Sequence, residues 1–284
     1  MPSKIEIKKL KKKEDNKEIN LKGGIVIDGF ASSSGLVNAI ASECLIHSTG
    51  TDLVAFLDSP DFPPISVVNN YVPQYPMRIY VNESLKVAFF VSDINIDKVA
   101  QRDVAKAMLR WTTENECKLI ISAQGILSLS SSHHSQNKNG NKITGNEVSN
   151  YDDNNNNDTA KSTIPTTLTP LPGDIYAVAS TEAAAKLITK LSNYFTPLRF
   201  GTVTGIPAIL LNEGALMNLD VIVFVVNVLR DVPDFRAAAI VSEAISRIIP
   251  NLSCDIDGLI VEAQIIENRM KNVRAEQKRI SYIA

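Results

Sequence analysis

Residues 29–35 form the segment whose residue types are best suited to hold an anion, because glycine and small side chains let a backbone turn tightly. The candidate residues within it are Gly29, Phe30, Ser33 and Gly35. A helix that begins behind such a loop can receive a phosphate at its N-terminus. The lysine that holds a nucleotide's outer phosphates is absent, and Ala31 stands where a nucleophile elbow needs glycine. The segment is therefore predicted to be a structural turn rather than an anion site.

Two carboxylates in the next loop, Asp58 and Asp61, have the residue type of a general acid and base. The neighbouring residues are Ser59, Phe62, Pro63 and Pro64. Because prolines fix the course of this loop, the acids can equally be turn residues that accept hydrogen bonds from backbone N–H groups. We expect the loop to be structural or to lie in an interface.

Histidine, the usual base of a nucleophilic triad, is scarce in this sequence. His47 is expected on the surface near the end of a helix, and His133 and His134 fall in a polar insertion. No catalytic group of residues assembles by spacing alone. The sequence therefore predicts a protein that is not an enzyme.

Metal and cofactor motifs are also missing from the sequence. There is no dinucleotide-binding glycine motif, phosphate-binding loop or zinc-protease motif. The acidic run 152–158 lacks the regular ligand spacing and the closing glutamate of a calcium loop. Cys44, Cys117 and Cys254 are far apart, so we expect three reduced cysteines packed as small apolar residues, in a cytoplasmic protein. Neither a metal nor a cofactor is predicted.

The charge balance argues against nucleic acid as the main partner, since 29 basic and 31 acidic residues leave a net charge of −2. Residues 1–22 are an exception, with eight lysines and four acidic residues. No aromatic residues are interleaved with these lysines, so a solvated, partly mobile arm is favoured over a nucleic-acid-binding segment. The most apolar run, 221–226, is far too short to span a membrane.

Short, nearly continuous apolar runs alternate with stretches of helical periodicity. The runs that resemble strands buried on both faces are 25–27, 53–57, 87–91, 119–121, 175–178 and 221–226. Residues 77–81 and 85–91 are separated by a short turn and indicate a hairpin. This alternation predicts an α/β fold, a three-layer α/β/α sandwich with a mixed, largely parallel sheet.

A single α/β domain is expected over residues 23–279, after the arm at 1–22 and before a tail at 280–284. The segment 131–165 is rich in Asn, Ser, Thr and Asp and has few large apolar side chains. Such a segment cannot bury enough apolar area to offset the entropy of ordering the chain. We expect it to be a disordered insertion within a loop of the domain.

Several segments, taken in order, resemble the archaeal branch of the proteasome assembly chaperone family, related to the second chaperone of the eukaryotic pair. The segments are 29–37, 58–68, 77–80, 176–181, 203–206 and 234–239. The resemblance implies a fold similar to nucleoside phosphorylases, assembly into a homo-oligomer and binding to proteasome α subunits. It therefore favours a non-enzymatic chaperone or adaptor.

Some members of that family dock on the proteasome through a tail of a hydrophobic residue, a tyrosine and any residue. The tail here ends in Tyr282, Ile283 and Ala284, so the tyrosine is third from the end and follows Ser281. The pattern is displaced by one residue, which leaves docking and folding back onto the domain as alternatives. Two other functions stay open: an enzyme of phosphorylase or hydrolase type using the loops at 29–35 and 58–61, and a nucleic-acid adaptor using the basic arm.

Overall fold

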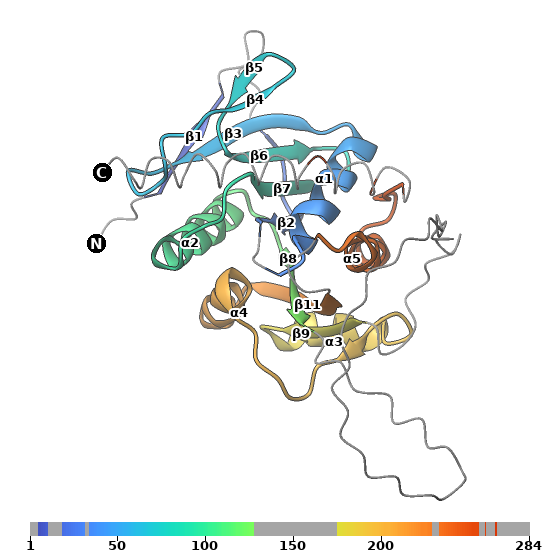
Figure 1. Ribbon diagram of the computed structural model, residues 1–284. Coiled ribbons are helices and arrows are strands. Elements are labelled where there is room, and N and C mark those ends of the chain that lie inside the picture. Colours follow the sequence, from blue (N-terminus) through green and yellow to red (C-terminus); the bar gives the residue numbers. More distant parts are fainter. Residues whose placement is uncertain are drawn as a thin grey trace, which may run out of the picture.

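The computed structural model describes residues 5–10, 19–31, 34–127, 175–228 and 233–255, together with Leu259 and Ile265. These residues form a nine-stranded sheet flanked by helices, and a separate two-stranded hairpin (Figure 1). The predicted insertion at 131–165 and the tail at 280–284 lie outside the described residues. Among the described helices, none is both long and apolar enough to cross a membrane.

The large sheet is mixed, and its parallel pairings are concentrated at the centre. Its strands, in spatial order, are β1 (Glu6–Lys9), β3 (Asp52–Asp58), β6 (Met77–Asn82), β7 (Val87–Ser92), β2 (Ile25–Gly29), β8 (Leu119–Leu127), β11 (Asp220–Val228), β9 (Ile175–Ala179) and β10 (Thr196–Pro197). Strands β7, β2, β8 and β11 pair in parallel, as do β9 and β10; the other four pairings are antiparallel. The predicted hairpin is formed by β6 and β7. Parallel and antiparallel pairings are equal in number, where the sequence predicts a largely parallel sheet.

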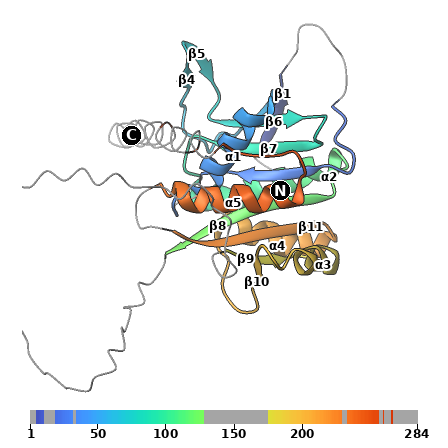
Figure 2. The same cartoon turned by 90° about the vertical axis from the view of Figure 1, so that its right-hand side faces the viewer.

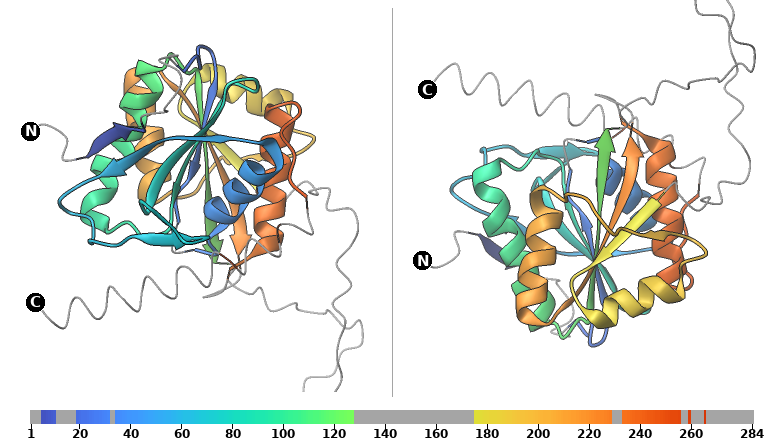
Figure 3. Two further views of the ribbon diagram at one scale, coloured as in Figure 1. Left: turned by 90° about the horizontal axis from the view of Figure 1, so that it is seen from above. Right: turned by 90° about the horizontal axis from the view of Figure 1, so that it is seen from below.

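Helices cover both faces of the sheet and confirm the predicted three-layer arrangement (Figure 3). One layer contains α1 (Val37–Thr49), α3 (Glu182–Lys190) and α5 (Phe235–Ile248); the other contains α2 (Lys98–Glu114) and α4 (Gly205–Met217). Successive residues of a strand pack against opposite helix layers, because their side chains point to alternate faces of the sheet. Phe89 packs in the α1 layer and Phe90 in the α2 layer, and both are fully buried.

Two helices begin with a side chain that caps the first turn. The Thr181 hydroxyl accepts a hydrogen bond from the Ala184 N–H at 3.1 Å, and the Asp234 carboxylate accepts one from the Ala237 N–H at 2.9 Å. Each side chain satisfies a donor that the first helical turn leaves unpaired. Helix α4 was not predicted, because its residues are apolar on nearly every side and leave no periodic pattern.

Part of the lysine-rich segment belongs to the sheet, which differs from the predicted solvated arm. Strand β1 pairs antiparallel with β3 at the sheet edge. Ile5 and Leu21, on either side of the undescribed residues 11–18, are buried in the core of the α2 layer. The Lys8 ammonium lies 2.6 Å from the Asp58 carboxylate on β3. Lysines on an edge strand discourage pairing with a further strand, so this charge pattern also suits an edge position.

The prediction of three reduced cysteines is wrong for two of them. Cys44 on α1 forms a disulfide with Cys254, which follows α5, across a sequence separation of 210 residues and a Cα–Cα distance of 5.5 Å. Helices α1 and α5 are neighbours in one layer, and this packing brings the two cysteines together. Cys117 is free and buried.

A buried arginine connects the antiparallel half of the sheet to the first helix. Arg78 of β6 is 2% exposed and is paired with Asp93, which follows β7, while its second terminal nitrogen lies 3.7 Å from Glu43 of α1. Its Nε donates to the Tyr80 hydroxyl at 3.2 Å and its Nη1 to the Tyr75 carbonyl at 2.9 Å. Buried charges are tolerated only when they are paired and hydrogen-bonded in this way.

Replacing Arg78 should therefore destabilise the fold strongly. Arg78→Met would leave Asp93 and Glu43 without their buried counter-charge, and we expect the free energy of unfolding to fall by about 3–5 kcal/mol in urea denaturation. Arg102→Met is the matched control, because Arg102 forms a mainly exposed pair with Glu213 and should contribute less than about 1 kcal/mol. Equal losses in the two variants would contradict the role assigned to Arg78.

Candidate functional site

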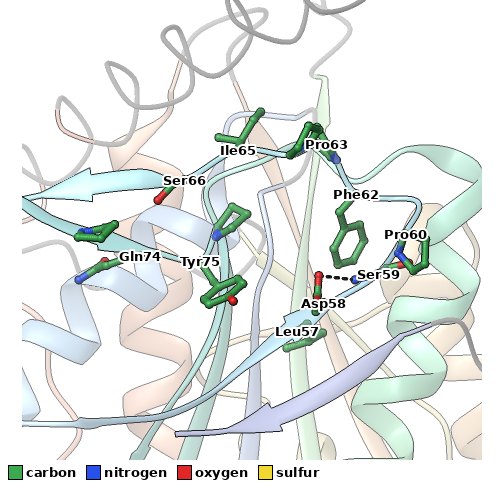
Figure 4. Close-up of a pocket in the computed structure, with 13 residues that line it drawn as sticks. Leu57, Asp58, Ser59, Pro60, Phe62, Pro63, Ile65, Ser66, Gln74 and Tyr75 are labelled. Carbon is green, nitrogen blue, oxygen red and sulfur yellow. Dashed lines mark hydrogen bonds between the residues drawn. The ribbon is translucent and has the colours of Figure 1, made fainter.

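A groove beside a protruding hairpin is the candidate functional site (Figure 4). The hairpin consists of β4 (Val67–Asn69) and β5 (Val72–Gln74) and interrupts the chain between β3 and β6. The groove has a volume of about 610 Å³. Its lining residues are Leu57, Asp58, Ser59, Pro60, Phe62, Pro63, Pro64, Ile65, Ser66, Pro73, Gln74, Tyr75 and Pro76. Five prolines in this set give the groove walls a restricted backbone.

The loop on one side of the groove is ordered by its own hydrogen bonds. The Asp58 carboxylate accepts from the Ser59 N–H at 2.9 Å, and the Ser59 hydroxyl accepts from the Asp61 N–H at 3.2 Å. The Phe62 N–H donates to the Ser59 carbonyl at 3.1 Å. Asp58 thus has the contacts of a turn residue and is also paired with Lys8. Pro63 and Pro64 continue the same wall.

The tip of the hairpin presents apolar side chains to solvent. Asn70 and Tyr71 join β4 to β5 as a two-residue turn, and both have left-handed backbone conformations, with φ of 48° and 66°. Tyr71 is 99% exposed, and Val68 and Val72 are 67% and 56% exposed. Figure 2 shows the hairpin extending away from the body of the protein. An exposed tyrosine on a defined turn resembles the anchor of a protein interface.

The base of the hairpin is fixed to the sheet. The Tyr75 ring stacks on Phe56 of β3, with ring centroids 3.6 Å apart. The Tyr75 carbonyl accepts the hydrogen bond from Arg78, and the Pro76 carbonyl accepts one from the Asp93 N–H at 2.8 Å. The hairpin is therefore held by the buried ion network, so its position at the groove is set by the core.

The chemistry of the groove favours a protein partner. Its walls are prolines, aromatic rings and aliphatic side chains, with Ser66 and Gln74 as polar groups opposite Phe62 and Pro60 (Figure 4). In the described part of the chain, no group of three or more His, Cys, Asp or Glu side chains could hold a metal ion. Rigid apolar surface of this kind loses little entropy on association.

The loop at 29–35, predicted to be a structural turn rather than an anion site, packs against its neighbours in its described part. Gly35 has a φ of 66°, and a Cβ there would lie 3.0 Å from Val228. The Gly35 carbonyl accepts a hydrogen bond from the Asp234 N–H at 3.0 Å. Val37 and Asn38, which begin α1, are 1% and 4% exposed, so the helix N-terminus is covered. Phe30 is buried in the core, and Ser33 lies outside the described residues.

The loops at 29–35 and 58–66 both follow the carboxyl ends of strands on the same side of the sheet, but they do not form one site. The loop at 29–35 follows β2 and the loop at 58–66 follows β3, and β6 and β7 lie between these strands. Three strand spacings correspond to about 14 Å. Gly29 and Asp58 are therefore not brought together as the enzyme hypothesis requires.

Asp28, at the carboxyl end of β2, is a buried acid that sequence reasoning missed. It is 1% exposed, and burial raises its pKa to about 6, although hydrogen bonds from the Ser122 hydroxyl and the Phe30 N–H act in the opposite direction. Those bonds measure 2.7 Å and 3.0 Å. The Asn38 amide lies 3.4 Å from the same carboxylate. The sequence around Asp28 does not reveal these partners, because Ser122 is 94 residues away in the chain.

The surroundings of Asp28 are those of a structural group. Its oxygens accept hydrogen bonds from protein donors, and the residue is 1% exposed, so a substrate could reach it only if these neighbours moved. His47 is a half-exposed residue in the last turn of α1, with Nε2 4.0 Å from Glu43 Oε2. The prediction that His47 is a helix-terminal surface residue is confirmed.

Asp28 should give the protein a pH-dependent stability. Because its pKa is about 6 in the folded state and 3.8 as the unperturbed reference, the folded state keeps its proton to higher pH. The stability that protonated Asp28 contributes to the free energy of unfolding is fully present below pH 3.8. It is lost as the pH rises through about 6, and the loss is roughly 3 kcal/mol. Asp28→Asn should therefore gain stability relative to the native protein by about this amount between pH 4 and 7 in urea denaturation. Asp52→Asn, at the exposed start of β3, is the control; parallel pH curves for the native protein and Asp28→Asn would contradict the account.

The sequence is similar to a known protein family and to a relative from an archaeon. Residues 26–274 match the PAC2 family. A relative named uncharacterized protein MJ0106, from Methanocaldococcus jannaschii, is 24% identical over 260 residues, which cover 92% of this chain and 89% of the relative.

Three solved structures share the fold. Pyrococcus furiosus PbaA, titled an archaeal homolog of proteasome-assembly chaperone, superposes with a TM-score of 0.66 at 20% identity over 95% of this chain and 99% of that one. Pyrococcus furiosus PbaB, titled an archaeal proteasome activator, gives 0.63 at 19% identity over 96% and 99%. A Thermoplasma acidophilum protein of unknown function gives 0.66 at 21% over 93% and 90%. The family match covers most of the sequence, and the chain therefore belongs to the PAC2 family, as the resemblance predicts.

Proposed function

We propose that this protein is a non-enzymatic proteasome assembly chaperone or adaptor that binds proteasome α subunits. The observation that carries the proposal is membership of the PAC2 family over residues 26–274. The titles of PbaA and PbaB, which share this fold, describe a homolog of a proteasome-assembly chaperone and a proteasome activator. The proposal includes self-association into a homo-oligomer, which the sequence resemblance implies.

The hairpin and its groove are proposed as the surface that contacts the α subunit. Tyr71 at the turn and Phe62 in the groove offer aromatic anchors, and Pro63 and Pro64 stiffen the wall between them. Aromatic residues on a rigid support dominate the affinity of protein interfaces. Arg78 and Asp93 hold the base of this surface, so little ordering is needed when a partner binds.

An enzymatic role is the less supported alternative. Asp58 is paired with Lys8, and Asp28 is buried with its carboxylate hydrogen-bonded to protein donors. The loops that the enzyme hypothesis combines are separated by two strands. The basic-arm hypothesis is weakened by β1, which places Glu6 to Lys9 within the sheet.

Binding to α subunits can be tested by size-exclusion chromatography of the full chain mixed with archaeal proteasome α subunits. We expect a complex to elute ahead of either component at micromolar concentrations. Light scattering of the free protein gives its oligomer number in the same experiment. Absence of a complex, with both components folded by circular dichroism, would contradict the proposed partner.

Substitution of Tyr71 isolates the hairpin as the contact surface. Tyr71→Gly removes the ring while placing glycine in the left-handed position that a tyrosine occupies at some cost, so the turn should be at least as stable. We expect affinity for α subunits to fall about tenfold or more, corresponding to ~1.4 kcal/mol per decade, with an unchanged thermal midpoint.

The matched control is Phe200→Ala. Phe200 is 93% exposed and lies between β10 and α4, at the opposite end of the sheet from the hairpin. This variant should bind α subunits like the native protein. An equal loss in both variants, or a loss in Phe200→Ala alone, would show that the hairpin is not the contact surface.

The C-terminal tail, which lies outside the described residues, stays a second candidate anchor. A tyrosine followed by a free carboxylate can dock in a pocket, but the spacing here is one residue longer than the family pattern. Removing Tyr282, Ile283 and Ala284 should lower affinity for assembled proteasomes tenfold or more if the tail docks. An unchanged affinity would eliminate the tail as an anchor, and a lower thermal midpoint would support its folding back onto the domain.

A further inference from the structure

The disulfide joins two parts of the fold that differ in accessibility. Cys44 lies on α1 and is 2% exposed within the core of that layer. Cys254 follows α5, is partly exposed, and packs against the edge of the same core. Thiol–disulfide exchange needs an approach to one sulfur, and Cys254 provides it while Cys44 stays shielded. A small thiol can therefore reach the cross-link from one side.

One backbone acceptor lies beside both sulfurs of the disulfide. The backbone carbonyl of Asp255 lies 3.4 Å from the Cys44 sulfur and 3.5 Å from the Cys254 sulfur. A thiol is a weak hydrogen-bond donor, and this carbonyl is within reach of either S–H group after reduction. Breaking the disulfide requires the two sulfurs to move apart, and the buried Cys44 thiol then has this carbonyl, which also accepts from the Leu259 N–H, as a nearby acceptor.

Cys117 provides an internal comparison. It is buried beside the Leu21 carbonyl, and burial raises the pKa of its thiol to about 11. A thiol with so little thiolate at neutral pH reacts slowly. One chain thus carries a paired site that solvent can reach and a single cysteine that is protected.

We propose that Cys44 and Cys254 form a reversible dithiol–disulfide site that exchanges with a small thiol of the glutathione class. In the oxidising direction, the Cys254 thiolate attacks the small disulfide and releases one thiol. The Cys44 thiol then loses its proton and displaces the second small thiol from the mixed disulfide. One S–S bond in the small molecule is broken and one in the protein is formed, with two electrons transferred and two small thiols released. This inference does not rest on the proposed binding of α subunits.

The redox state of the Cys44–Cys254 pair determines whether the segment after α5 is covalently attached to α1. Leu259 is 1% exposed in the same core, and its N–H donates to the Asp255 carbonyl at 3.0 Å. In the disulfide form, the adjoining Cys254 is also covalently joined to α1. In the dithiol form, Leu259 and the neighbouring apolar contacts hold this segment alone. The site therefore adds a covalent attachment where the C-terminal part of the chain begins.

A redox titration of the full chain tests the proposal. The protein is equilibrated in glutathione buffers from fully reduced to fully oxidised, quenched with iodoacetamide, and analysed by intact mass. We expect Cys44 and Cys254 to pass together from two alkylated thiols to a disulfide within this range, while Cys117 stays a thiol. A pair that stays in one state throughout, or a stable mixed disulfide on Cys254, would overturn reversible exchange.

The stabilisation provided by the Cys44–Cys254 disulfide is measured by the thermal midpoint of the oxidised and of the reduced protein. A cross-link that closes a loop of 210 residues should raise the midpoint of the oxidised protein by about 10 °C over the reduced protein. Cys254→Ser should abolish this difference, whereas Cys117→Ser should keep it. Equal midpoints in the two redox states of the native protein, or a difference that persists in Cys254→Ser, would overturn the stabilising role of the disulfide.

Discussion

The buried guanidinium of Arg78 is the interaction on which the antiparallel half of the protein depends. It places a positive charge among Asp93 and Glu43 inside the core, and so joins β6, the end of β7 and α1. Its hydrogen bond to the Tyr75 carbonyl fixes the point where the hairpin returns to the sheet. A buried charge is tolerated only when it is fully paired. The elements around Arg78 therefore have few alternative packing arrangements. The same interaction therefore stabilises the core and positions the surface proposed to bind a partner.

The carboxyl edge of the sheet has two parts with different properties. At its centre, Asp28 is buried at the end of β2, and its carboxylate accepts hydrogen bonds from the Phe30 N–H and the Ser122 hydroxyl. Open α/β sheets usually bind small molecules at this place. Beyond β6, the long connection from β3 forms an open groove and lifts Tyr71 into solvent. In the described residues, the acid at this central position is buried and apolar surface is exposed beside it, which is an arrangement suited to protein binding.

Much of the fold could be predicted because buried strands such as β7 and β11 are continuous apolar runs. Strand β1 was missed because an edge strand can carry lysines, and α4 because an apolar helix has no periodic face. The groove loop was identified as a structural or interfacial segment, but the three-residue strands of the hairpin are too short to show a pattern. The partners of Asp28 and Arg78 and the pairing of Cys44 arise only from tertiary packing, and no local spacing encodes them.

Hydrogen–deuterium exchange of the full chain, with and without proteasome α subunits, tests the central claim most directly. The account predicts that binding slows exchange in residues 57–76, the groove and hairpin, and leaves the loop after β2 unchanged. Slower exchange around that loop with no change in residues 57–76 would contradict it, because the partner would then bind near Asp28 rather than at the hairpin.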